Sequence, residues 1–229
     1  MQPNIQMIPQ TGDLAVARNK VLRNTYMLLA LSLIPTVIGA LVGTSMNFAW
    51  AAQHPMMFGL GSFALMMGLM FGVSASRNSP LGVVLLLAFT LMMGLLLGPI
   101  LQVALRLSNG GQIIGLAAGG TSAIFFVLAG IATTSKRDFS FLGKFLMVGI
   151  VLLIVASLAN LFFQIPAFAL ALSGVAVLLF SGFLLFDVSR VVNGGETNYI
   201  MATLAIYLDI YNLFINLLNI LMAVMGNRD

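Results

Sequence analysis

Long apolar runs separated by short polar breaks are the main pattern of this chain. A transmembrane helix needs about 20 mostly apolar residues, and seven runs reach that length. They are Tyr26–Met46, Met56–Ala75, Leu81–Leu105, Gln112–Thr134, Phe141–Phe163, Ala167–Val188 and Tyr199–Met225. The pattern therefore predicts an all-α integral membrane protein built as a bundle of seven transmembrane helices.

The polar and glycine-rich breaks set the domain organisation. Residues 1–23 are polar and form a predicted N-terminal tail, whereas residues 24–229 form a single seven-helix transmembrane domain. Pro35 and Pro99 fall inside apolar runs, where proline is expected to kink a helix. Glycines also recur at a spacing of four that lets helices approach closely in lipid, although so many glycines also produce such pairs by chance. The pairs are Gly39/Gly43, Gly68/Gly72, Gly94/Gly98 and Gly115/Gly119.

Composition agrees with a membrane protein and excludes several functions. Hydrophobic residues make up 60% of the chain and charged residues 7%, whereas soluble proteins carry about 25% charged residues. There is no cysteine, so disulfides, thiolate metal sites and cysteine nucleophiles are excluded. The basic residues lie near helix ends and form no continuous stripe, so we expect no nucleic-acid partner.

The distribution of basic residues predicts an orientation, because cytoplasmic loops carry an excess of Lys and Arg. With a cytoplasmic N-terminus, eight basic residues fall inside and two outside. Those inside are Arg18, Lys20, Arg23, Arg77, Lys136, Arg137, Lys144 and Arg190, and those outside are Arg106 and Arg228. Seven spans then place the C-terminus outside, which is the periplasm for a bacterial inner membrane. A re-entrant last helix would instead return the C-terminus to the inside, and the charge count does not exclude that alternative.

Two aspartates, Asp187 and Asp209, carry most of the candidate chemistry. Both lie in or at the edge of an apolar run, where an acidic residue costs roughly 2.5–3.5 kcal/mol on insertion scales and marks a functional site by default. Asp187 falls near the cytoplasmic end of its helix, and Asp209 lies about ten residues, or roughly 15 Å, into the last helix. A tilt or kink would bring the two side chains together.

Two stripes of uncharged polar residues accompany the aspartates. Asp209 shares one face of the last predicted helix with Asn212, Asn216 and Asn219, which follow at helical spacing. A shorter stripe on Phe141–Phe163 and its end consists of Ser157, Asn160 and Gln164. The two stripes either line a hydrated path through the bundle or join helices by hydrogen bonds worth about 0.6 kcal/mol each.

A pair of close carboxylates has three interpretations. One carboxyl holds its proton to higher pH, so the pair can sense pH. The pair can also supply oxygen ligands to a hard cation such as Ca²⁺, with Asp187 and Asp209 as metal ligands. The third interpretation is a structural salt bridge to Arg190, one turn from Asp187, or to Arg77.

Catalysis is not expected. The GxGD motif of intramembrane aspartyl proteases is absent, because Asp209 follows Ile206-Tyr207-Leu208. A rhomboid-type serine protease needs GxSG and a helical histidine, but the single histidine, His54, lies in a short predicted loop. The last run contains no lysine, which excludes a retinal Schiff base. We therefore predict no enzyme and no catalytic residues.

Several short motifs together resemble the Bax inhibitor-1 family, and its bacterial YccA-like branch in particular. They are Val21-Leu22-Arg23-Asn24-Thr25-Tyr26, Gly98-Pro99-Ile100, Ser140-Phe141-Leu142-Gly143, Gly194-Gly195-Glu196-Thr197-Asn198-Tyr199-Ile200 and Tyr211-Asn212-Leu213-Phe214. The resemblance covers the whole transmembrane region. It implies seven helices, with the last helix central and the other six around it.

The resemblance also implies two functions. In the wider family, an acidic pair at the positions of Asp187 and Asp209 is proposed as a pH-sensitive gate for calcium leak, with an associated basic residue that we match to Arg77 by position. The run Met56–Ala75 lacks the acidic residue that some relatives carry there, which counts against strong calcium conduction. Members of the YccA-like branch modulate FtsH, a membrane AAA protease.

We therefore expect an inner-membrane regulator of FtsH-type proteolysis, for which the tail 1–19 would serve as a handle. An ordinary disordered terminus is the alternative for that tail. The second expected function is a pH-sensitive cation leak gated by the aspartate pair.

Overall fold

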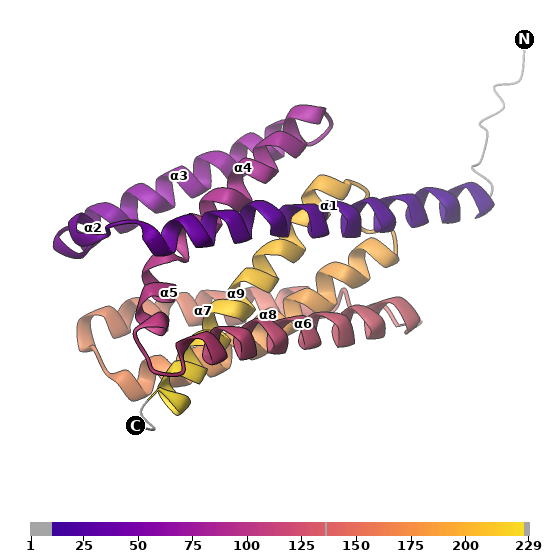
Figure 1. Ribbon diagram of the computed structural model, residues 1–229. Coiled ribbons are helices and arrows are strands. Elements are labelled where there is room, and N and C mark those ends of the chain that lie inside the picture. Colours follow the sequence, from indigo (N-terminus) through magenta and orange to yellow (C-terminus); the bar gives the residue numbers. More distant parts are fainter. Residues whose placement is uncertain (1–10, 136, 227–229) are drawn as a thin grey trace, which may run out of the picture.

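The computed structural model describes residues 11–135 and 137–226, which are helical with short connections and contain no strand (Figure 1). The helices of this part are α1 (Thr11–Ser45), α2 (Ala49–Gln53), α3 (Pro55–Ala75), α4 (Pro80–Leu96), α5 (Gly98–Leu105), α6 (Gly110–Thr134), α7 (Leu142–Phe163), α8 (Pro166–Val192) and α9 (Tyr199–Met225). Three of the longer helices, α3, α4 and α8, begin at a proline, where the missing N–H costs no helical hydrogen bond.

The predicted seven membrane spans are confirmed. Within the described residues, seven helical segments are long and apolar enough to cross a bilayer. They are Arg18–Ser45, Pro55–Ala75, Pro80–Leu105, Gly110–Thr134, Leu142–Phe163, Pro166–Val192 and Tyr199–Met225. The chain is therefore an all-α polytopic membrane protein, and the five-residue helix α2 is an addition that no apolar run predicted.

Helix ends and breaks differ in detail from the predicted runs. The predicted kink at Pro99 is present as an interruption at Leu97, after which α5 restarts at Gly98. Pro35 lies inside α1 without ending it. Helix α1 begins at Thr11, well inside the predicted tail 1–23, and the first ten residues of that tail lie outside the described residues.

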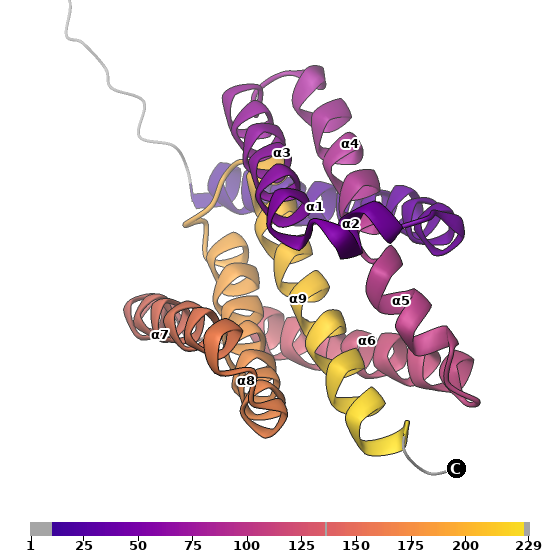
Figure 2. The same cartoon turned by 90° about the vertical axis from the view of Figure 1, so that its left-hand side faces the viewer.

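The helices pack in two groups that meet at α9. Helix α1 packs mainly on α4, and α9 packs on α8, α6 and α1, with smaller contacts to α3 and α4. In contrast, the principal helical neighbour of α7 is α8, on whose outer side it lies in Figure 2. That the last helix is the centre of the bundle stays a prediction.

A close helix contact joins α1 to α4 and α5, and four glycines form it; we call it the glycine seam (Gly39, Gly43, Gly94 and Gly98). A Cβ added at Gly39 would meet the Leu91 carbonyl oxygen, and one at Gly94 would meet the Thr36 carbonyl oxygen. Two of the predicted glycine pairs are therefore packing contacts. The pair Gly115/Gly119 on α6 meets nothing within 4 Å.

Hydrogen bonds add a third helix to the glycine seam. The Thr36 and Tyr207 hydroxyls lie 2.8 Å apart, which joins α1 to α9. The Thr36 hydroxyl also approaches the Thr90 carbonyl oxygen of α4 at 3.2 Å, and the Tyr211 hydroxyl donates to the Met93 carbonyl at 3.1 Å. Tyr207 is 1% exposed, so these polar groups are satisfied inside the bundle.

Candidate functional site

Helices α8 and α9 bring the two predicted aspartates together. Asp187 lies near the end of α8, and Asp209 lies in the first half of α9 with 5% of its surface exposed. Their carboxyl groups are within hydrogen-bonding range of each other. Because an ionised carboxylate only accepts hydrogen bonds, one of the two must carry a proton for this bond to form. The second oxygen of Asp209, Oδ2, is buried and has no hydrogen-bond partner among the described residues.

Arg190 is the charged neighbour of the pair. Its Nη1 lies 3.7 Å from Asp187 Oδ1, and its Nη2 lies 3.7 Å from Glu196 Oε2. The guanidinium also lies 5.5 Å from the centre of the Phe186 ring, a distance at which a cation is attracted to an aromatic face. Both ion pairs are longer than a hydrogen bond, so Arg190 acts on Asp187 and Glu196 by charge.

The loop between α8 and α9 positions this arginine. Gly194 has φ +78°, which a glycine adopts without strain, and the next amide, of Gly195, donates to the Arg190 carbonyl at 2.8 Å. The Asn198 amide N–H donates to Glu196 Oε1 at 2.8 Å. The glycine-rich motif that carried the family resemblance thus fixes Glu196 opposite Arg190.

Asn198 connects the same loop to α9 and to the α3–α4 turn. Its Oδ1 accepts hydrogen bonds from the Ile200 and Met201 amides and so caps the N-terminus of α9. Its Nδ2 donates at 2.9 Å to the Arg77 carbonyl and to Asn78 Oδ1. Sequence reasoning did not assign Glu196 or Asn198, although an asparagine just before a long apolar run is a typical N-cap signal.

Arg77 does not join the aspartates. Its side chain is exposed, and only its main-chain carbonyl takes part in the network through Asn198. In the described part of the chain, no carboxylate lies within 4.0 Å of its guanidinium. The main chain of Arg77 therefore belongs to the network of Asn198, whereas its charge lies apart from the aspartate pair.

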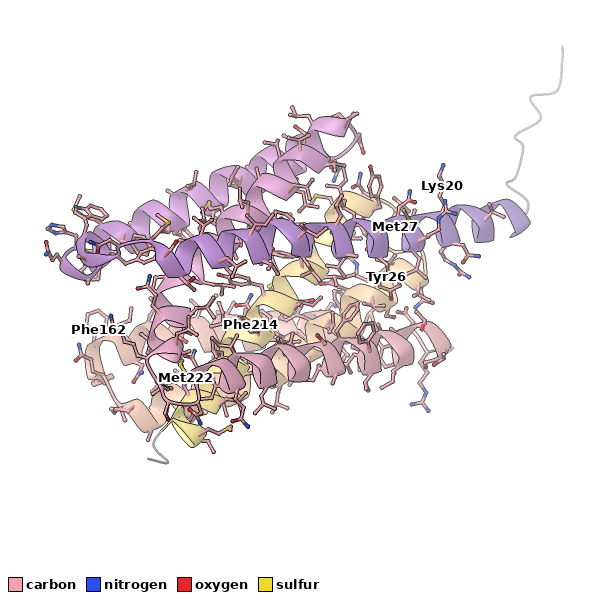
Figure 3. All side chains as sticks on the ribbon, in the orientation of Figure 1. Lys20, Tyr26, Met27, Phe162, Phe214 and Met222 are labelled. Atoms are coloured by element: carbon pink, nitrogen blue, oxygen red, sulfur yellow. The ribbon has the colours of Figure 1, made fainter. Side chains whose placement is uncertain are left out.

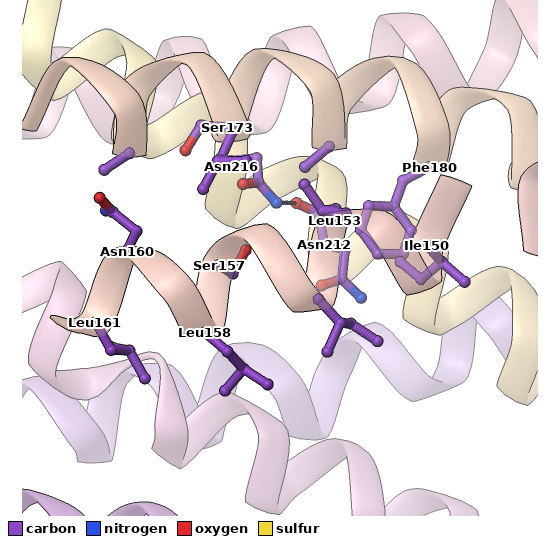
Figure 4. Close-up of a pocket in the computed structure, with 14 residues that line it drawn as sticks. Ile150, Leu153, Ser157, Leu158, Asn160, Leu161, Ser173, Phe180, Asn212 and Asn216 are labelled. Carbon is purple, nitrogen blue, oxygen red and sulfur yellow. Dashed lines mark hydrogen bonds between the residues drawn. The ribbon is translucent and has the colours of Figure 1, made fainter. Parts of the chain in front are cut away.

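The two predicted polar stripes meet at a cavity of about 460 Å³ between α7, α8 and α9 (Figure 4). Ser157 and Asn160 line it from α7, Ser173 from α8, and Asn212 and Asn216 from α9. The other two members of the stripes do not line it. Gln164 is exposed where α7 ends, in a left-handed conformation, and Asn219 lies one turn beyond Asn216.

The side-chain amides of Asn212 and Asn216 form hydrogen bonds within α9. Asn212 Nδ2 donates to the Leu208 carbonyl and Asn216 Nδ2 to the Asn212 carbonyl, both at 2.8 Å and both within α9. Asn160 Oδ1 accepts from the Ile165 amide at 3.2 Å and closes the α7–α8 turn. The alternative of interhelical hydrogen bonds is therefore wrong for these amides. Asn212 lies one turn from Asp209, so the polar cavity begins next to the aspartate pair.

A resident calcium ion at the aspartate pair stays a prediction. Calcium takes six to eight oxygen ligands, whereas the described residues contain no cluster of three or more His, Cys, Asp or Glu side chains that would hold a metal. The two aspartates here contact each other and face a guanidinium. The predicted use of Asp187 and Asp209 as metal ligands has no support in this geometry.

The fold and its polar interior define a polytopic all-α membrane protein with a buried carboxyl pair. A family model described as "Inhibitor of apoptosis-promoting Bax1" matches residues 18–227. The chain therefore belongs to the Bax inhibitor-1 family, as its motifs predicted.

Relatives in several bacteria are similar over nearly their whole length. The "Modulator of FtsH protease YccA" of Escherichia coli K12 is 41% identical over 90% of this chain and 91% of its own length. The "Inner membrane protein YccA" of Escherichia coli O6:H1 has the same identity and coverage. An "Uncharacterized membrane protein" of Vibrio cholerae is 40% identical over 99% of this chain and 100% of its own length.

Proposed function

We propose that this chain is a non-enzymatic regulator of an FtsH-type membrane protease in the bacterial inner membrane, which it binds and restrains. The observation that carries the proposal is its similarity to the YccA modulator of FtsH protease, at 41% identity over 90% of the chain. The Lys/Arg distribution supports a cytoplasmic N-terminus and a periplasmic C-terminus.

The N-terminal part of α1 is the proposed contact element. Helix α1 has 35 residues, which makes it about 52 Å long at 1.5 Å per residue. The hydrocarbon core of a bilayer is about 30 Å thick. The first turns of α1 therefore reach beyond the bilayer, and in Figure 1 they extend past the neighbouring helices. A rigid helical extension would hold the tail away from the membrane surface, within reach of a protease.

Deletion of residues 1–17, which precede the first span, tests this proposal. The turnover of another substrate of the same protease is measured in cells that lack the native regulator and produce equal amounts of either form. We expect faster turnover with the truncated form, because the restraint requires the extension. A control with residues 1–17 in scrambled order separates sequence from length. A turnover rate unchanged by the deletion would contradict the proposal.

A second candidate function is a pH-sensitive cation leak, with the cation as cargo. The contact between Asp187 and Asp209 supports it, because loss of the shared proton would leave two like charges side by side and separate α8 from α9. The polar cavity that begins one turn away supports it as well. In liposomes, Asp187→Asn and Asp209→Asn are each expected to remove the pH dependence of calcium flux. Asn219→Ala, outside the cavity, is the control. Identical flux in the wild type and in all three variants would exclude this function.

A further inference from the structure

A long apolar groove runs between α1 and α6, with α9 as its floor. It consists of two cavities of about 560 and 580 Å³ that share Leu33, Thr121, Ser122 and Ile210. The first cavity extends to Tyr26 on α1 and Thr133 on α6, and the second to Thr44 and Gly111. In Figure 1, α1 and α6 lie one above the other with α9 crossing between them. Because both walls are membrane-spanning helices, the groove lies at the depth of the lipid acyl chains.

The length and volume of the groove determine what fits in it. From Tyr26 to Thr44 the α1 wall is about 27 Å long, close to the hydrocarbon thickness of about 30 Å. Together the two cavities leave space along this wall for an extended hydrocarbon chain, which is long and thin enough to lie in the groove.

Two arginines flank one end of the groove. Arg23 lies one turn before Tyr26 on α1, and Arg137 follows the end of α6 beyond Thr133; both are exposed. The acid beside Arg137, Asp138, accepts hydrogen bonds from the Ser140 amide at 2.9 Å and the Ser140 hydroxyl at 2.6 Å. These bonds hold the pKa of Asp138 below its usual value and occupy its Oδ1 with Ser140 rather than with Arg137. Among the described residues, one basic residue, Arg106, follows the opposite end of the groove.

We propose that this groove binds an anionic phospholipid, with one acyl chain between α1 and α6 and the phosphate between Arg23 and Arg137. Apolar walls suit the chain, and a guanidinium group on each side of the end of the groove suits phosphate oxygens. The site is separate from the aspartate pair and from the proposed contact with a protease. It makes the anionic lipid content of the membrane a determinant of how α1 is held against α6.

Quenching by brominated lipid tests this site in reconstituted protein. Trp50 is the only tryptophan, so Trp50→Phe provides a background for one new reporter. Tyr26→Trp places the reporter in the groove, on the side of α1 that faces α6 in Figure 3. Met27→Trp is the matched control, because Met27 is at the same depth but 65% exposed on another face. Leu33→Trp, also in the groove, replaces Tyr26→Trp if that variant does not fold.

Brominated phosphatidylglycerol is expected to quench the groove reporter at lower mole fractions than brominated phosphatidylcholine, with no such preference at Met27→Trp. Arg23→Gln and Arg137→Gln are each expected to lower the relative affinity for phosphatidylglycerol about fivefold. Lys20→Gln, at an exposed residue that points away from α6 in Figure 3, should leave this relative affinity unchanged. Equal quenching of both reporters by both lipids would overturn the proposal. So would a groove reporter shielded from both lipids, because protein would then fill the groove.

Discussion

The glycine seam and the α7–α8 contact use the same small residue in opposite ways. In the glycine seam, added Cβ atoms would meet backbone: at Gly43 the Leu95 carbonyl oxygen would lie at 2.7 Å. Between α7 and α8 they would meet the ends of flexible side chains, Leu179 Cδ2 at 2.5 Å from Gly149 and Leu146 Cδ2 at 2.7 Å from Gly182. Backbone cannot move aside, whereas a leucine can change rotamer. One contact is therefore fixed and the other adjustable.

The hydrogen bonds of the polar side chains also differ between the glycine seam and the α7–α8 contact. At the glycine seam, the Thr36 and Tyr207 hydroxyls bond across helices. Beside the α7–α8 contact, the amides of Asn212 and Asn216 bond within α9 and border a cavity. The structure thus has a rigid half, which is α1 with α4 and α5. In the other half, α7 packs on α8 and borders a cavity lined by polar side chains. The predictions below test this difference, from the largest effect on stability to the smallest.

Gly94→Val should disrupt the rigid half. The new side chain would be forced against the Thr36 carbonyl oxygen, and we expect a loss of about 3 kcal/mol in the free energy of unfolding. Gly115→Val on α6 meets nothing within 4 Å and should stay within about 0.5 kcal/mol. The stability of both variants is measured by heating the proteins in detergent and determining the folded fraction by size-exclusion chromatography. Equal stability of the two variants would refute the rigid character of the seam.

Tyr207→Phe should weaken the seam moderately. It removes the hydroxyl that bonds to Thr36, but Thr36 still bonds to the Ser32 carbonyl at 2.9 Å. We therefore expect a loss of about 1 kcal/mol, measured by the same unfolding assay. Tyr199→Phe, at the start of α9, is the control and should change stability little. A loss for Tyr207→Phe as large as that for Gly94→Val would mean that hydrogen bonds rather than close packing hold the seam.

Gly182→Ala should have almost no net effect. The added methyl group displaces one end of Leu146, and alanine in place of glycine favours a helix by up to about 1 kcal/mol. We expect a change within about 0.5 kcal/mol, in contrast to Gly94→Ala, which should be clearly destabilising. If both alanine variants were equally unstable, the α7–α8 contact would be as rigid as the seam.

Ser157→Cys should leave stability unchanged and report whether water enters the cavity. The chain has no cysteine, so a water-soluble thiol reagent would label only this position. Val155→Cys, on the exposed side of α7 away from the cavity, should stay unlabelled in the bilayer. Failure to label Ser157→Cys would mean that lipid rather than water fills the space beside Asn212 and Asn216.

Sequence reasoning predicted much of this fold because membrane spans are long and strongly apolar. It located seven spans and the interruption at Pro99, since both depend on local composition. It did not find helix α2, which is too short for any periodic signal. It also began the first helix too late, because polar residues continue a helix readily once it leaves the bilayer.

The site was predicted less completely, because contacts between helices depend on side-chain direction. The approach of Asp187 to Asp209 was expected from their rarity in apolar helices, and Arg190 from its spacing. Arg77 was expected by position alone, and the structure turns its carbonyl rather than its guanidinium toward the network. No sequence signal indicated the groove between α1 and α6, since ordinary apolar residues from helices far apart in the chain form it.

The position of α9 also has a consequence for biosynthesis. This helix follows the other six spans in the chain, yet it packs against α1, α6 and α8. During synthesis from the N-terminus, α1 and α6 therefore enter the membrane before the helix that forms the floor between them. Until α9 is inserted, Thr36 lacks its Tyr207 partner and Asp187 lacks its Asp209 partner. Thr36 keeps its bond to the Ser32 carbonyl until then, so the seventh span is the step that adds the second carboxyl group and completes the fold.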